Sequence, residues 1–181
     1  MRAYVPAYDV TAAISLDHAL RLLADEPGTI KVLAGGTDLM VLLEAGDLPP
    51  GKFVSLWGLP ELRGIHVADD AVTLGALTTY TEIQEHAVVR AEYPMLCEAA
   101  RLTGALAIQN RGTIGGNVIN ASPAADSPPA LLVYGAELEL VSRAGARRRP
   151  YDGFHSAYKK MDRRPDEILK AIRLPRRPGG P

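Results

Sequence analysis

Two glycine-rich segments are the part of the sequence best suited to binding an anion. The first reads Val32-Leu33-Ala34-Gly35-Gly36-Thr37-Asp38-Leu39, and the second reads Arg111-Gly112-Thr113-Ile114-Gly115-Gly116-Asn117. Consecutive glycines let backbone N–H groups converge on an anion with no Cβ in the way, especially where a helix begins. The hydroxyls of Thr37 and Thr113 add possible donors. Each segment is therefore expected to form a nest of N–H groups, and the two together suit a diphosphate.

The glycine pairs alone are a weak signal. With 17 glycines in 181 residues, roughly one or two Gly-Gly pairs arise by chance, and such pairs usually mark turns. The sequence contains neither G-x-G-x-x-G nor G-x-x-x-x-G-K-[ST], so it does not indicate an ordinary dinucleotide fold or a P-loop. Whether the two segments bind phosphate therefore has to be judged from the residues around them.

No other residues are spaced for catalysis or metal binding. The four histidines are dispersed, and the single cysteine, Cys97, excludes an internal disulfide, a cysteine-ligated iron–sulfur cluster and a thiolate zinc finger within this chain. Cys97 is expected to be a buried, inert thiol on a helix, and Trp57 a core residue between two lobes. We therefore predict no catalytic residue and no metal site.

The composition is that of an ordinary globular protein. Hydrophobic residues make up 47% of the chain, and 20 Lys and Arg nearly balance 21 Asp and Glu. The sequence shows no apolar run long enough for a membrane span and no signal-peptide pattern, which predicts a cytoplasmic protein. Residues 1–142 carry 8 basic and 17 acidic side chains (net −9), whereas residues 143–181 carry 12 and 4 (net +8). Without an aromatic platform or a known nucleic-acid module, binding of nucleic acid is not expected.

The N-terminal part predicts a small α/β lobe. Ser15 can cap a helix whose apolar residues recur with helical spacing up to Leu23, with Gly28 as its stop. A strand over 29–34, the Gly-Gly turn and a helix capped by Thr37 or Asp38 follow. A further strand over 53–56 would pair in parallel, because helices intervene between the strands.

The rest of the chain predicts a larger antiparallel sheet with helices. Strands are expected over 65–67, 72–77, 137–142, 147–151 and 167–174. Thr79 and Glu82 have capping-box spacing for a helix through about Val89, and Pro94 suits the first turn of the next helix. Asp126 precedes Ser-Pro-Pro and can cap a short helix that ends at Gly135. These patterns together predict an α+β fold.

Five ordered segments resemble the FAD-binding subunit or domain of the molybdenum hydroxylases, the family of xanthine dehydrogenase and aerobic carbon monoxide dehydrogenase. They are Ala34–Leu39, Leu56–Leu62, Leu74–Thr78, Arg111–Asn117 continuing through Ala121–Asp126, and Tyr158–Lys160 with Pro165–Leu169 and Ile172–Pro175. The resemblance implies two lobes, residues 1–57 and 58–181. It covers nearly all of this chain but lacks the third, C-terminal lobe of the family.

The same resemblance implies FAD with its pyrophosphate between the two glycine-rich segments, Val32 to Leu39 and Thr113 to Asn117. Asn120 and Asp126 would lie near the sugar and linker atoms, Ile114 near the isoalloxazine and Leu169 against the ring system. Asp126 could accept hydrogen bonds from ribose or ribityl hydroxyls, cap its helix, or do both.

The implied function is electron transfer. FAD would receive electrons from an iron–sulfur (2Fe-2S) subunit and pass them to NAD⁺, a quinone or oxygen, while substrate is hydroxylated at a molybdenum-cofactor subunit. Two alternatives remain: an assembly module that keeps the fold without flavin, and a stand-alone FAD-dependent oxidase, for which the sequence offers no acid/base pair. Because the third lobe is missing, we expect an unpaired strand edge and apolar surface around Leu169 and Ile172, and with it self-association or partner binding.

Overall fold

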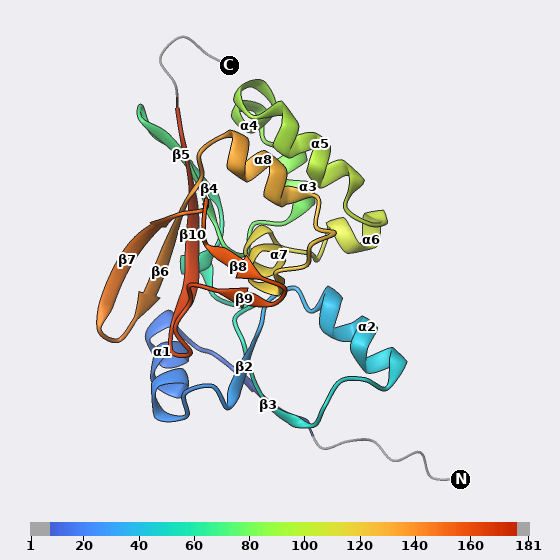
Figure 1. Cartoon of the computed structure of the whole chain (residues 1–181), viewed down its shortest axis with the longest axis vertical. Helices are drawn as coiled ribbons and strands as arrows, with labels where there is room; N and C mark the ends of the chain where they lie inside the picture. Colours follow the sequence, from blue (N-terminus) through green and yellow to red (C-terminus); the bar gives the residue numbers. More distant parts are fainter. Residues whose placement is uncertain (1–7, 177–181) are drawn as a thin grey trace.

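The computed structural model describes residues 8–176, which form two sheets joined by a short link (Figure 1). A three-stranded sheet with helix α1 forms one end of the molecule, and a five-stranded sheet with most of the helices forms the other. The expected mixed α+β fold is confirmed. Within the described residues, no helix combines the length and the apolar character that crossing a bilayer requires.

The small sheet is parallel, as expected. Its strands, in the order β1-β3-β2, are β1 (Tyr8–Ala12), β2 (Ile30–Leu33) and β3 (Gly51–Ser55). Helix α1 (Leu16–Asp25) begins at Ser15, whose hydroxyl accepts a hydrogen bond from the His18 N–H, and Gly28 adopts a φ of +78° two residues beyond the C-cap Glu26. Strand β1 was not predicted, because four of its five residues are exposed and leave no apolar pattern.

The large sheet is antiparallel and has the order β4-β5-β10-β6-β7. Its strands are β4 (Ile65–Val67), β5 (Ala71–Gly75), β6 (Glu137–Ser142), β7 (Gly145–Pro150) and β10 (Ile168–Pro175). A separate hairpin joins β8 (His155–Ala157) to β9 (Lys160–Met161). In the register of the sheet, Ile172 lies between Leu74 and Leu138, and all three side chains are fully buried.

The expectation of an unpaired edge around Leu169 and Ile172 is wrong. Strand β10 lies in the middle of the sheet, where Ile172 is paired with both β5 and β6 and Leu169 with β6, and the two side chains are 0% and 4% exposed. The last strand returns between β5 and β6, so the edges of the sheet are β4 and β7. Exposed apolar side chains lie instead on helix α2 (Thr37–Ala45), which buries none of its residues. The exposed apolar side chains of α2 are those of Met40, Val41, Leu42 and Leu43.

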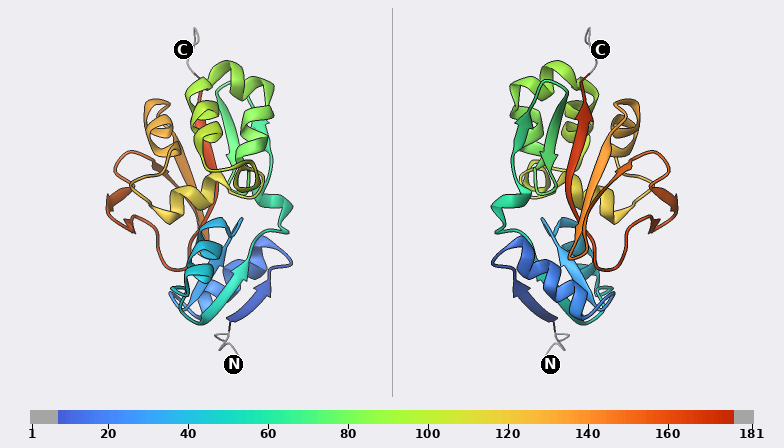
Figure 2. Two further views of the ribbon diagram at one scale, coloured as in Figure 1. Left: turned by 90° about the vertical axis from the view of Figure 1, so that its right-hand side faces the viewer. Right: turned by 90° about the vertical axis from the view of Figure 1, so that its left-hand side faces the viewer.

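Helices cover one face of the large sheet (Figure 2). They are α3 (Tyr80–Glu85), α4 (Ala87–Glu92), α5 (Pro94–Leu102), α7 (Ile114–Asn120) and α8 (Ser127–Val133). Two short helices lie apart from this cluster: η1 (Pro60–Leu62), a single 3₁₀ turn in the link, and α6 (Leu106–Gln109). The capping box of Thr79 and Glu82 and the N-terminal position of Pro94 are confirmed. The expectation of one continuous helix through Val89 is wrong, because His86 ends α3 and caps α4. The ring Nδ1 of His86 accepts a hydrogen bond from the Val89 N–H.

Two apolar clusters form the core, and the second one crosses the link. The first lies between the large sheet and its helices. The second joins Leu20, Leu23 and Val54 of the small sheet region to Val141 and Ile168 of the large sheet. The lobe boundary after residue 57 stays a prediction, since apolar packing continues across it.

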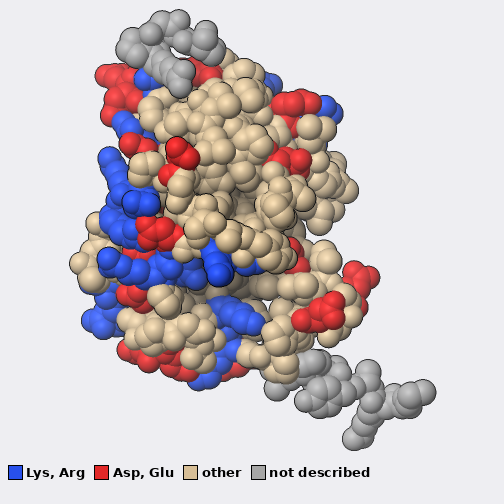
Figure 3. All heavy atoms as spheres, viewed as in Figure 1, with Lys and Arg blue, Asp and Glu red and all other residues tan. Residues whose placement is uncertain are grey.

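Four arginines of the C-terminal part are bound to carboxylates of the same chain. Arg147 contacts Glu167 and Asp162, Arg149 contacts Asp162, Arg173 contacts Asp70 and Glu137, and Arg176 contacts Glu92. Figure 3 shows basic side chains along the side formed by β6 and β7, with acidic ones among them. Arg173 and Arg176 thus join the basic segment to carboxylates of residues 1–142, whereas Arg147 and Arg149 pair within the basic segment.

The pair of Arg147 and Glu167 is the most buried of these contacts. The Glu167 side chain is 2% exposed. Its carboxylate accepts hydrogen bonds from Arg147 Nε at 2.6 Å and from Arg147 Nη2 at 2.9 Å. Burial alone would raise the pKa of Glu167, but the hydrogen bonds from Arg147 and from the Arg164 N–H lower it below its usual value. The ionised carboxylate is thus the form that the fold stabilises.

We predict that Glu167→Gln lowers the free energy of unfolding by roughly 2–4 kcal/mol at pH 7, because Arg147 loses its buried charged partner. Since the pKa of Glu167 is depressed on folding, this stability is fully present above the unfolded pKa of about 4.3 and is lost as the pH falls through the folded value. Urea unfolding at pH 7 and pH 3 measures both effects. Glu98→Gln, in an exposed pair on α5, is the matched control and should change little. An equal loss at both pH values would contradict the prediction.

Candidate functional site

A cleft of about 780 Å³ opens between the two sheets. Its walls come from β2, the start of α2, the start of α7 and the chain around the start of β10. Its volume falls in the range of ligand pockets in proteins. Thirteen of the sixteen predicted site residues line it: Val32, Ala34, Gly35, Gly36, Thr37, Asp38, Leu39, Thr113, Gly115, Gly116, Asn117, Asn120 and Leu169.

The first glycine segment forms an open helix N-terminus. Gly36 is the N-cap of α2 and has a φ of +81°, a conformation that glycine adopts without strain. The expectation that Thr37 or Asp38 caps α2 is wrong, since neither side chain forms a cap bond. Among the described residues, the N–H groups of Gly36, Thr37, Asp38 and Leu39 have no hydrogen-bond acceptor. They supply the free donors and the positive helix end that attract an anion.

The second glycine segment has no free nest, so that expectation is wrong. The Ile114 N–H donates to the Thr78 carbonyl at 3.0 Å, and the Gly115 N–H donates to the Ala76 carbonyl at 2.9 Å. The Gly116 N–H donates to the Thr113 hydroxyl, which caps α7. Apart from that of Thr113, the N–H groups that the sequence offered to a phosphate are used by α7 and by the chain that follows β5.

The glycines of the second segment serve close packing. A Cβ on Gly115 would lie 2.6 Å from the Ala76 carbonyl oxygen and Cβ, both in the interior. A Cβ on Gly35 would overlap the carbonyl of Arg111. The two glycine segments therefore cross in direct backbone contact, and this crossing forms the floor of the cleft.

Polar side chains link α2, α7 and the β8–β9 turn beside the cleft. Asn120 Nδ2 donates to Asp38 Oδ1 at 3.0 Å, and Lys159 in the β8–β9 turn donates to Asn120 Oδ1. Asn117 lines the cleft as well, and its buried Oδ1 is without a hydrogen-bond partner in the described part of the chain. That oxygen is a free acceptor for a ligand donor.

Three predicted site residues lie outside the cleft lining. The Ile114 side chain is fully buried in the core, Leu33 is not part of the lining, and Asp126 lies beyond it. The Asp126 carboxylate occupies the N-cap position of α8 without a cap bond and accepts from the Thr103 hydroxyl at 3.3 Å. The capping role expected of its side chain is therefore wrong.

Sequence patterns missed several residues of the cleft. Arg163 lines it and donates from Nη1 to the carbonyls of Arg164 and Glu167, while burial lowers the pKa of its guanidinium. Tyr80 lines the opposite part, and burial raises its pKa to about 12. Neither residue belongs to a motif, and only the preceding Thr79 cap marked the region of Tyr80.

The cleft holds no histidine or cysteine, and the described residues contain no group of three His, Cys, Asp or Glu side chains placed for a metal. Cys97 is half-buried, burial raises the pKa of its thiol, and its Sγ contacts the Ile83 carbonyl at 3.5 Å.

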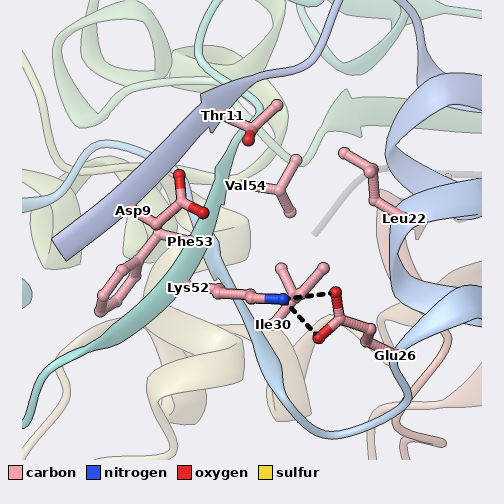
Figure 4. Close-up of a pocket in the computed structure, with 8 residues that line it drawn as sticks. All are labelled: Asp9, Thr11, Leu22, Glu26, Ile30, Lys52, Phe53 and Val54. Atoms are coloured by element: carbon pink, nitrogen blue, oxygen red, sulfur yellow. Dashed lines mark hydrogen bonds and ion pairs between the residues drawn. The ribbon is translucent and has the colours of Figure 1, made fainter.

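A second hollow, of about 100 Å³, lies beside the small sheet (Figure 4). The Lys52 ammonium in this hollow is already bonded to both Glu26 carboxylate oxygens, at 2.7 and 2.8 Å. The large cleft is thus the hollow suited to binding a ligand, and its lining carboxylates, Asp38 and Glu167, are bonded to Asn120 and Arg147.

Comparisons with known proteins agree with this geometry. The family described as "FAD binding domain in molybdopterin dehydrogenase" matches residues 6–177. The xanthine dehydrogenase FAD-binding subunit of Escherichia coli O157:H7 is 39% identical over 167 residues, which cover 92% of this chain and 57% of that subunit. The carbon monoxide dehydrogenase medium chain of Hydrogenophaga pseudoflava is 31% identical over 170 residues, 94% of this chain and 59% of that one.

A solved structure of carbon monoxide dehydrogenase from Hydrogenophaga pseudoflava superposes with a TM-score of 0.92 at 30% identity, covering 97% of this chain and 61% of the matched one. The chain thus spans less than two thirds of the length of these relatives. The family match nevertheless extends over almost the whole sequence, and it confirms the resemblance and the cofactor. This chain belongs to the FAD-binding domains of the molybdenum hydroxylase (molybdopterin dehydrogenase) family.

Proposed function

We propose that this chain holds FAD in the cleft and serves as the electron-transfer component of a molybdenum-dependent dehydrogenase. The observation that carries the proposal is the start of α2, where four adjacent N–H groups without acceptors face a cleft of about 780 Å³. A phosphate is the anion that such an N-terminus binds best, because its oxygens accept several N–H bonds and its charge is favoured by the helix dipole.

The residues present fit both the polar and the apolar parts of FAD. The pyrophosphate would lie on the N–H groups of Gly36 to Leu39. Asn117 Oδ1, a buried acceptor without a partner, and Asn120 would face sugar or linker hydroxyls. Leu169 and the neighbouring Ile168 and Leu77, all nearly inaccessible to solvent, would form an apolar wall for a ring. Leu33, Ile114 and Asp126 would support these contacts from behind the lining.

Bound FAD supplies the redox chemistry, and the chain supplies binding, orientation and shielding from water. The carboxylates that line the cleft are bonded within the chain, Asp38 to Asn120 and Glu167 to Arg147, which favours electron transfer over substrate oxidation in this cleft. We propose that electrons arrive from an iron–sulfur subunit, that a molybdenum-cofactor subunit carries out substrate chemistry, and that the final acceptor is NAD⁺, a quinone or oxygen. The relatives named as dehydrogenase subunits and chains support this assignment.

We predict that the protein prefers FAD to FMN by at least tenfold, or about 1.4 kcal/mol. FAD presents a diphosphate and an adenosine along the cleft, whereas FMN presents a single phosphate and lacks the second half of the ligand. Calorimetric titration of deflavinated protein with each nucleotide measures the ratio. Equal affinities would contradict the arrangement, and a lack of binding to either would favour the assembly module over the flavoprotein.

We predict that Gly36→Val weakens FAD binding by at least tenfold. Valine at a φ of +81° strains the backbone and disturbs the free N–H groups at the start of α2. Gly46→Val is a matched control, since Gly46 has a φ of +78° at the other end of the same helix and does not line the cleft.

Both variants should lose similar stability, of about 1–2 kcal/mol, because the left-handed conformation is equally unfavourable at each site. Flavin occupancy, circular dichroism and thermal unfolding distinguish binding from folding. The first glycine segment would be an ordinary turn if folded Gly36→Val kept the flavin content of Gly46→Val.

A further inference from the structure

Trp57 lies between two guanidinium groups. It is the single tryptophan of the chain and follows β3 in the link between the sheets. The Cζ of Arg63 lies 4.3 Å from its ring centroid, and the Cζ of Arg111 lies 3.8 Å from it. Both distances are within the range of a cation–π contact, for which an indole is the best aromatic partner. Trp57 is half-buried, which corrects the expectation of a core side chain.

The two arginines differ in what they hold besides the ring. Arg63 Nη2 donates to the carbonyl of Trp57 itself at 2.7 Å, so it stabilises its own turn. Arg111 Nη2 donates to the carbonyl of Gly35 at 3.4 Å, in the segment that leads into α2. The backbone carbonyl of Arg111 also lies where a Cβ of Gly35 would be. Of the two, Arg111 is therefore the one that connects the indole to the first glycine segment.

This contact acts on a peptide group that faces the cleft. The Gly35 carbonyl and the Gly36 N–H belong to the same planar peptide unit. A cation at the carbonyl oxygen fixes the plane of that unit and polarises it, which makes the N–H on its other side a stronger donor. The Gly36 N–H is one of the donors without an acceptor among the described residues.

We propose that Arg111, in cation–π contact with Trp57, is a positioning residue for the diphosphate of the bound dinucleotide. It orients and polarises the Gly35–Gly36 peptide so that the donors at the start of α2 converge on the phosphates. The inference rests on the proposed function, because it needs a nucleotide diphosphate at α2. Arg63 stacks on the same ring without reaching the glycine segment.

The first test compares Arg111→Lys with Arg63→Lys. Lysine keeps the charge but loses the planar guanidinium that stacks and donates at the same time. Titration calorimetry of the deflavinated protein uses FAD, ADP and riboflavin as probes. Arg111→Lys should weaken FAD and ADP by a similar factor of about five to ten and leave riboflavin within twofold, since riboflavin carries no phosphate. Arg63→Lys should leave all three within twofold.

The second test substitutes the indole ring of Trp57. Trp57→Phe keeps an aromatic face for Arg111 and should retain FAD affinity within about threefold, whereas Trp57→Leu removes the face and should reproduce the loss in Arg111→Lys. In Arg111→Lys without flavin, the emission of Trp57, the single tryptophan, should shift, because its ring loses one of the two guanidinium groups that contact it. Circular dichroism and thermal unfolding verify that each variant is folded. If Arg111→Lys is not folded, Arg111→Gln takes its place in the comparison.

The outcomes separate the two proposals. If the unmodified protein binds neither FAD nor ADP, the proposed function fails. If it binds both and the Arg111 variants keep its affinities, the function stands and the positioning role is wrong. Equal losses in the Arg63 and Arg111 variants, or a loss that includes riboflavin, would show that the stack only stabilises the fold, and they would overturn the positioning role as well.

Discussion

The cleft depends on the direct backbone crossing of its two glycine segments. Gly35 lies so close to the Arg111 carbonyl that a side chain there would occupy the same space. This approach brings the start of α2, in the small-sheet region, next to α7, which is packed on the large sheet. Without the crossing, the free N–H groups of α2 would not face the rest of the lining. Glycine is required here by space, in addition to the positive φ at Gly36.

The two glycine segments that cross differ in whether their backbone N–H groups are already hydrogen-bonded. The second segment pairs like a strand with the chain after β5: the Tyr80 N–H donates to Gly112, and the Ile114 and Gly115 N–H groups donate to Thr78 and Ala76. It is therefore a support in which every backbone donor from Arg111 to Asn117 except that of Thr113 is satisfied. The first segment contributes the open donors. A rigid floor beneath an open helix start is a preorganised anion site, because little backbone ordering remains when the ligand binds.

Ion pairs and apolar packing hold the walls of the cleft at a fixed separation. Glu167 lines the cleft and is held by Arg147 of β7, while Ile168 packs into the apolar cluster shared by the two sheets. The basic C-terminal part thus neutralises acidic groups within the chain. Arg147, Arg149, Arg173 and Arg176 act as cross-links within the chain.

Local signals in the sequence determined the starts of α1, α3 and α5, since Ser15, Thr79 and Pro94 act on neighbouring backbone groups. They also determined the parallel and antiparallel sheets and the glycines of the cleft. Tertiary structure decided which glycine segment keeps free donors, the central place of β10 and the contact of Arg111 with Trp57 and Gly35. The acceptors for Ile114 and Gly115 come from Thr78 and Ala76, more than thirty residues earlier. A hydrogen bond or a strand pairing between distant segments exists only after the chain has folded, so no local pattern encodes it.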